Sequence, residues 1–263
     1  MAEAAGLTLG VVALASLFNN AVECFEFIQL GRSFGKNFQT SQLKLDNARL
    51  RLSRWGFSLG LNDTIQNVQS LEQRFGSRQN IDHAEALLGQ TLELFADAEG
   101  VSKKYKSGRN VKDGSLAVFN PHTDLDPTNI YLHNKMRQLS IERQNRTSLQ
   151  RKAKWALYEE KRFRRLIEDV TELVNDLVEL FPASQAIQQQ LCEKEVSIIG
   201  ATEGISVLRE IAAEQDEFLE EALAKVPNDT SSIRVTFSGS NNSGFQLGHN
   251  SGSISGFTFG QRS

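Results

Sequence analysis

Amide side chains and glycines alternate with other residues near the C-terminus of this chain. Reading outward from Gln246 in either direction gives a glycine and then an asparagine, within a pattern that runs from Asn242 to Gly252. If identical chains stack in register about 4.7 to 4.8 Å apart, each amide lies above its own copy and hydrogen-bonded ladders form. The spacing therefore predicts amyloid-type self-assembly through Asn242, Gly244, Phe245, Gln246, Leu247, Gly248, Asn250 and Gly252.

The composition around this motif suits stacking in register. Between residues 231 and 263 the charged residues are Arg234 and Arg262, so few like charges would be stacked. Short apolar alternations have the two-residue period of a β-strand, but the segment is too short and too rich in glycine to bury a core alone. We expect residues 227–231 to form a linker and 232–263 a disordered, amyloid-forming tail. The alternative is a flexible Gly/Ser-rich tail with no role.

Little in the chain points to catalysis. The late glycines lack the strand-turn-helix context of a phosphate-binding loop. Cys24 and Cys192 are far apart in the sequence, and we expect both to be small buried hydrophobic residues. We predict that the chain is not an enzyme and has no cofactor and no metal. Neither metal spacing nor a nucleophile partner is evident for the histidines, His83, His122, His133 and His249.

The chain opens on an uncharged, apolar segment that runs from Ala4 to Val22. Its nineteen residues are borderline for a membrane span, which needs about 20. A secretory signal is disfavoured because no Lys or Arg precedes the segment. At rest we expect a helix shielded in a bundle, with a buried face of Leu7, Val11, Leu14, Phe18, Val22, Phe25 and Ile28. The functional interpretation adds that this helix leaves the bundle and enters lipid through Leu7, Val11, Val12, Leu14, Leu17 and Phe18.

From about residue 34 to 226 the apolar residues recur at helical spacing. Nine of them, from Phe163 to Phe181, form one stripe over five turns, and Pro182 follows. Asp126-Pro127 is typical of a helix start, and Ile205 to Leu223 should form a last amphipathic helix. Residues 106–120 indicate a loop with a short extended piece. The fold class is therefore all-α, a helical bundle over residues 1–226.

A basic stretch lies between Lys135 and Arg165, with eleven basic residues opposed by three glutamates. Anionic lipid would attract each basic residue near its surface by about 1 kcal/mol. The alternative is a solvated helix face that is balanced by the acidic residues that follow. RNA binding is disfavoured because aromatic residues are not interleaved, and the formal net charge of -3 argues against nucleic acid in general.

The sequence between residues 17 and 35 resembles the start of the HeLo domain of HET-s-type fungal proteins. The resemblance is carried by Leu17-Phe18-Asn19-Asn20, Glu23-Cys24-Phe25-Glu26, Gln29-Leu30-Gly31-Arg32 and Phe34-Gly35. It continues over residues 50–56 and 154–158. The tail is similar to the pseudo-palindromic amyloid motif of fungal cell-death proteins, and to the RIP homotypic interaction motif. HET-s-type tails form a two-repeat β-solenoid, whereas this tail has a different motif, so solenoid residue roles are not carried over.

These resemblances imply a cell-death effector of the heterokaryon-incompatibility or innate-immunity type. The implied partners are further copies of the chain, as an amyloid and through a possible dimer of the helical domain, an immune-type receptor with a matching motif, and membrane lipids. The implied location is the cytoplasm at rest and the plasma membrane after activation. Glu23, which ends the uncharged run, and Ser33, inside a glycine-flanked hinge at residues 31–35, are the expected switch residues. The alternative is a non-toxic adaptor whose bundle dimerises and whose tail recruits partners.

Overall fold

The computed structural model describes residues 2–62, 74–109, 114–144, 154–199 and 204–226, with side chains from residue 8 onward. The chain divides into two units, Met1–Lys225 and Val226–Ser263. The predicted linker and amyloid motif, including Asn242, Gln246 and Asn250, lie outside the described residues. The first unit is a helical domain, so the predicted all-α class is confirmed.

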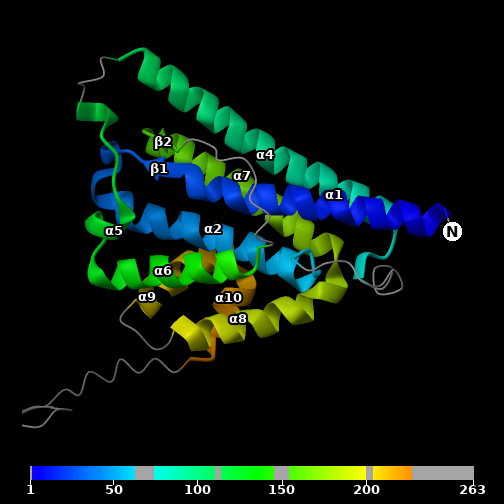
Figure 1. Ribbon diagram of the computed structural model, residues 1–263. Helices are drawn as coiled ribbons and strands as arrows, with labels where there is room; N and C mark the ends of the chain where they lie inside the picture. The colour runs from blue at the N-terminus through cyan, green and yellow to red at the C-terminus, as the bar shows by residue number, and fades with distance from the viewer. Residues whose placement is uncertain (1, 63–73, 110–113, 145–153, 200–203, 227–263) are drawn as a thin grey trace, which may run out of the picture. The chain divides into compact units, whose positions relative to one another are not determined.

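The helical domain is built around α2 (Phe38–Ser58), which runs through its middle (Figure 1). On one side lie α1 (Ala2–Cys24), α4 (Arg78–Ser107) and α7 (Glu160–Leu180), with α1 packed along α4. On the other side lie four helices that complete the fold, α6 (Pro127–Glu142), α8 (Gln185–Ile199), α9 (Ile205–Gln215) and α10 (Glu217–Ala224). The short elements are η1 (Phe25–Phe27), η2 (Arg32–Asn37), η3 (Gly114–Leu116), α5 (Pro121–Asp124) and η4 (Pro182–Ser184).

Two helix predictions are confirmed in detail. The stripe that begins at Phe163 lies on α7, whose apolar face is buried and which ends just before Pro182. Asp126 caps α6, where its carboxylate accepts a hydrogen bond of 2.9 Å from the amide of Asn129. The single helix predicted for residues 205–223 is wrong, because Asp216 leaves helical geometry and separates α9 from α10.

A two-stranded parallel sheet, which the helical periodicity does not predict, follows α1. Strand β1 (Ile28–Leu30) pairs with β2 (Trp155–Leu157), so that Ile28 lies opposite Trp155 and Leu30 opposite Leu157. A bridge between Gly31 and Val118 adds a third piece of extended chain. That bridge confirms the short extended segment predicted within residues 106–120.

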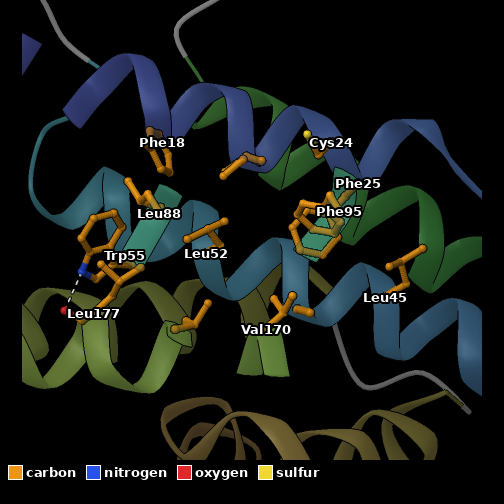
Figure 2. Close-up of a cluster of buried hydrophobic side chains, with 14 of the residues drawn as sticks. Phe18, Cys24, Phe25, Leu45, Leu52, Trp55, Leu88, Phe95, Val170 and Leu177 are labelled. Atoms are coloured by element: carbon orange, nitrogen blue, oxygen red, sulfur yellow. Dashed lines mark hydrogen bonds between the residues drawn. The ribbon is translucent and has the colours of Figure 1, made fainter. Parts of the chain in front are cut away.

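Aromatic side chains from the C-terminal part of α1 and from η1 reach into the core, as Figure 2 shows. The ring of Phe18 meets Trp55 edge to face at 6.2 Å, and Phe25 meets Phe95 in the same way at 4.9 Å. The indole of Trp55 donates a hydrogen bond of 2.9 Å to the carbonyl of Leu177, which ties α2 to α7. Such edge-to-face pairs add about 0.5 to 1.5 kcal/mol beyond burial.

Gly56 allows Phe18 to approach α2 closely. A Cβ built at Gly56 would lie 2.2 Å from Cε2 of the Phe18 ring, a distance that real Cβ atoms do not adopt. The ring is completely buried and cannot move into solvent without opening the core. The packing of α1 on α2 therefore depends on the absence of a side chain at residue 56.

We predict that Gly56→Ala displaces Phe18 and loosens α1. The free energy of unfolding should fall by about 1 to 3 kcal/mol, the usual cost of overpacking a core. Urea unfolding of the soluble chain measures this change. Gly89→Ala, on α4 with nothing within 4 Å of an added Cβ, is the matched control and should stabilise by about 0.5 to 1 kcal/mol. Equal behaviour of the two variants would contradict the proposed contact.

Candidate functional site

The apolar helix α1 has two unlike faces. Val11, Leu14, Phe18 and Val22 are buried against α2 and α4, as the predicted helical face requires. On the opposite face Leu9 is 71% exposed and Val12 55% exposed, so the expectation that the whole segment is shielded is right for one face only. Leu17 is half-buried, whereas the side chain of Leu7 lies outside the described part of the chain.

The length of α1 suits a membrane. Within the described residues, one helical segment, Thr8–Phe27, is long and apolar enough to cross a bilayer, with a mean hydropathy of 1.4. Soluble core helices and signal sequences can satisfy the same criterion, so composition alone does not decide the role of the segment. What distinguishes α1 is that it combines this composition with an exposed apolar face.

The chain that follows α1 is held on two sides. The amide of Gly31 donates to the carbonyl of Leu157 at 2.7 Å, and the amide of Arg32 donates to that of Ala117 at 2.8 Å. From the other direction the amide of Phe119 donates to the carbonyl of Leu30 at 2.8 Å. We call residues 28–32 the anchor, because they fix the C-terminal end of α1 to two distant parts of the chain.

The two glycines of the expected hinge have different environments. A Cβ at Gly31 would lie 2.7 Å from Cδ1 of Tyr158, so this glycine serves close packing. Gly35 adopts a φ of +51° with open space around it, so it alone has the conformational freedom expected of a hinge. Ser33 donates its hydroxyl hydrogen to the carbonyl of Tyr158, and Glu23 is half-buried one residue before the end of α1.

A buried ion cluster lies between α2, α8 and the corner at which α9 meets α10. Arg54 is fully buried, and its guanidinium binds Glu195 of α8 at 2.7 Å and Asp216 at 3.0 Å. Burial opposes its charge, but the two carboxylates outweigh that effect and raise the pKa of Arg54 well above its usual value. Arg143, just beyond α6, also pairs with Glu195. The cluster therefore joins α2, α8, the end of α6 and the α9–α10 corner.

This ion cluster and the α1 contact share one stretch of α2. Arg54 holds the α9–α10 corner, Trp55 touches Phe18, and Gly56 receives the Phe18 ring. Asp216 also caps α10, since its carboxylate accepts a hydrogen bond from the amide of Leu219 at 3.3 Å. Because α10 is the last described helix before the tail, residues 54–56 connect both ends of the helical domain.

A second polar cluster lies at the C-terminal end of α1. Glu26 pairs with Arg49 and with Arg137, and these two charges lower the pKa of Glu26 although burial opposes the shift. Nearby, Nδ1 of His133 lies 2.7 Å from Asp46.

The basic stretch from Lys135 to Arg165 does not form one surface, because Arg137 and Arg143 pair with Glu26 and Glu195 inside the domain. Arg146, Arg151 and Lys152 of that stretch lie outside the described residues.

The ion cluster could not be predicted from the sequence. In the sequence, Arg54 lies beside apolar residues of a helical stripe. A charged residue at such a position is the signal that could have indicated a buried ion pair. Its partners are 141 and 162 residues away, so the sequence pattern does not pair them. Cys24 and Cys192 are both buried, as predicted, and burial raises the pKa of the Cys192 thiol. Among the described residues, no group of three or more potential metal ligands is found.

We predict that Asp216→Asn destabilises the domain strongly, because it removes one of the two carboxylates that neutralise buried Arg54. Breaking a buried ion pair costs about 3 to 5 kcal/mol, which urea unfolding would detect. Glu193→Gln removes the partner of an exposed pair with Lys225 and should cost less than about 1 kcal/mol. A small effect of Asp216→Asn, similar to that of this control, would show that the cluster is not a structural link.

Comparison with known proteins places both parts of the chain. Residues 6–211 match the HeLo family model, described as prion-inhibition and propagation. Residues 230–256 match the model described as a SesB domain on fungal death-pathway protein. This second match includes the whole predicted amyloid motif, from Asn242 to Gly252, whose centre is Gln246.

Relatives and solved structures agree with the family models. The chain is 34% identical over 229 residues to heterokaryon incompatibility protein S of Podospora anserina, and the match covers 86% of this chain and 75% of that protein. Heterokaryon incompatibility protein s of the same species gives the same values, and neither name is that of an enzyme. The solved HET-s N-terminal domain is similar with a TM-score of 0.69 at 33% identity, covering 80% of this chain and 95% of that one. A doubly substituted form of that domain gives a TM-score of 0.72 at 34% identity, with coverage of 80% and 96%. The chain belongs to the HeLo, or prion-inhibition and propagation, family.

Proposed function

We propose that this chain is a fungal cell-death effector of the heterokaryon-incompatibility or innate-immunity type. Its tail is templated into an amyloid fold, and that event activates the helical domain to insert into membranes and permeabilise them. The observation that carries the proposal is α1, an apolar helix of membrane-spanning length that is covered on one face only. Membership of the HeLo family and the match of the tail to a fungal death-pathway domain support it.

The trigger is the tail, residues 232–263. Gln246 and the flanking Asn242 and Asn250 form amide ladders when copies stack in register. Phe245 and Leu247 supply the dry face, while Gly244, Gly248 and Gly252 allow tight bends. The template is another copy of the chain or an immune-type receptor with a matching motif, and residues 227–231 serve as the linker.

The ion cluster around Arg54 couples assembly of the tail to the packing of α1. Tail assembly crowds helical domains along a fibril and strains the α9–α10 corner that precedes the tail. Separation of Asp216 from Arg54 leaves a buried charge without one of its two partners, which is costly. To lower that cost, α2 moves at residues 54–56. Phe18 of α1 is held at the same residues, so α1 is loosened.

The released α1 is the membrane-active element. The twenty residues Thr8–Phe27 span about 30 Å as a helix, which matches the hydrocarbon core of a bilayer. Leu7, Val11, Val12, Leu14, Leu17 and Phe18 are the inserting residues. Glu23 stays near the headgroups, and α1 turns where it enters the anchor, while Ser33 and Gly35 lie beyond that point. The resting protein is cytoplasmic, and the activated protein acts at the plasma membrane.

Seeding tests both halves of the proposal. Soluble full-length chain is mixed with dye-loaded vesicles and with fibrils of residues 228–263, and conversion and dye release are followed together. The unmodified chain should convert and release dye. Val12→Glu should convert but release no dye, because residue 12 lies within the span Thr8–Phe27 and a charge inside the hydrocarbon core is costly, by about 2.5 to 3.5 kcal/mol or more at its centre. Since Val12 is exposed at rest, this change does not disturb the core.

Two further variants complete the experiment. Val12→Leu, which keeps the face apolar, should release dye like the unmodified chain. Gln246→Lys stacks like charges and should neither convert nor release dye. Undiminished dye release from Val12→Glu would exclude α1 as the inserting element. Conversion of the unmodified chain without any dye release would favour the adaptor function.

A further inference from the structure

Exposed cations from three segments that are distant in the sequence gather at one end of the helical domain. Arg32 and Lys36 belong to η2, Lys106 and Arg109 lie at the end of α4, and Lys154 and Lys161 flank β2. All six side chains are exposed. We call these six residues the basic end.

Contacts around Tyr158 bring the three segments together. Its ring stacks on Tyr105 of α4 with the centroids 4.8 Å apart, and the guanidinium of Arg109 lies 4.1 Å above the Tyr105 ring. Its carbonyl accepts the hydroxyl hydrogen of Ser33 in η2. Asn37, at the end of η2, donates to Glu160 of α7 at 3.0 Å. The basic end is therefore held by packing and hydrogen bonds, and it is not a chance gathering of mobile side chains.

Nearby carboxylates leave most of this charge unbalanced. Asp124 lies 3.4 Å from Arg32. Glu159 pairs with Arg162, and Glu160 lies 3.7 Å from Arg164, so these two acids are already engaged with arginines of α7. Among the described residues, no carboxylate forms an ion pair with Lys36, Lys106, Lys154 or Lys161.

The same end holds the fixed terminus of α1. Figure 1 shows the N-terminus of α1 at the opposite end of the helix from β1 and β2. After α1 the chain enters the anchor, residues 28–32, between β2 and residues 117–119. Arg32 is the last residue of the anchor, and Lys154 directly precedes β2. The point about which α1 would turn thus lies among the cations of the basic end.

We infer that the basic end is a docking surface for anionic lipid headgroups, which orients the domain with the fixed end of α1 toward the bilayer. This inference rests on the proposed function. A helix that turns about this end enters lipid directly and leaves Arg32 and Lys36 on the side from which it entered, where flanking basic residues favour retention. Nucleic acid fits less well, because Tyr105 and Tyr158 stack on one another and Tyr158 is buried, so neither ring offers an open face for bases.

The test measures binding of the soluble, unseeded chain to phosphatidylcholine vesicles with and without about one-third phosphatidylserine. Each basic residue near an anionic surface changes partitioning about fivefold, so Lys106→Glu combined with Lys161→Glu should weaken binding by about 25-fold or more. Lys194→Glu combined with Lys225→Glu changes the net charge equally on α8 and beyond α10, and should bind like the unmodified chain. Binding of the unmodified chain should also weaken with added salt.

Seeded dye release separates this inference from the proposed function. Loss of both lipid binding and dye release in the Lys106→Glu/Lys161→Glu variant, with fibril conversion intact, supports the docking surface. Equal binding by the two double variants overturns it, even if seeded dye release persists and the proposed function stands. Tighter salt-sensitive binding to RNA than to phosphatidylserine vesicles would overturn the choice of lipid. A chain that binds vesicles through the basic end but never releases dye would instead contradict the proposed function alone.

Discussion

The contact between Phe18 and Gly56 is the constraint on which this structure depends. An aromatic ring can lie directly on the backbone of α2 only because residue 56 has no side chain, and Trp55 closes over its edge. Together with the packing of α1 along α4, that contact covers one face of an apolar helix, while Leu9 and Val12 on the other face remain exposed to water. The helix is therefore held by a single packed face and one anchor. This arrangement keeps α1 in the folded domain through its inner face while its outer apolar face stays exposed.

The buried charges make this packing sensitive to displacement of the α9–α10 corner. Arg54 is stable without solvent only while Glu195 and Asp216 both lie beside it. An ion cluster of this kind adds little net stability over an apolar core, but losing one partner is expensive. Because Arg54 directly precedes Trp55 and Gly56, a displacement of the α9–α10 corner is transmitted to the residues of α2 that hold α1. A domain built in this way responds to displacement of its C-terminal helix more strongly than one with a wholly apolar interface.

The helices could be predicted from the sequence because their signals are local. The stripe from Phe163 on α7 and the Asp126-Pro127 start of α6 depend on neighbouring residues. The sheet could not be predicted, because its strands have three residues each and pair across more than a hundred positions. The break at Asp216 could not be predicted, because the apolar period continues through this residue, whereas in the structure its carboxylate turns inward to Arg54. The buried face of α1 was predicted, but its exposed face follows from packing that periodicity does not encode. The roles of Glu23, Ser33 and the tail residues stay predictions.

The central claim is that α1 must leave the bundle for membranes to be damaged, and a reversible tether tests it most directly. A Cβ at Gly10 would lie 3.1 Å from Cγ2 of Ile81, and the nearer neighbour is the flexible end of the Arg78 side chain, which can move aside. Cysteines at positions 10 and 81 are therefore close enough for a disulfide between α1 and α4. The oxidised Gly10→Cys/Ile81→Cys chain should convert when seeded but release no dye, and reduction should restore release. The single Ile81→Cys variant should release dye under both conditions. Equal dye release from the oxidised and reduced double variant would contradict the account.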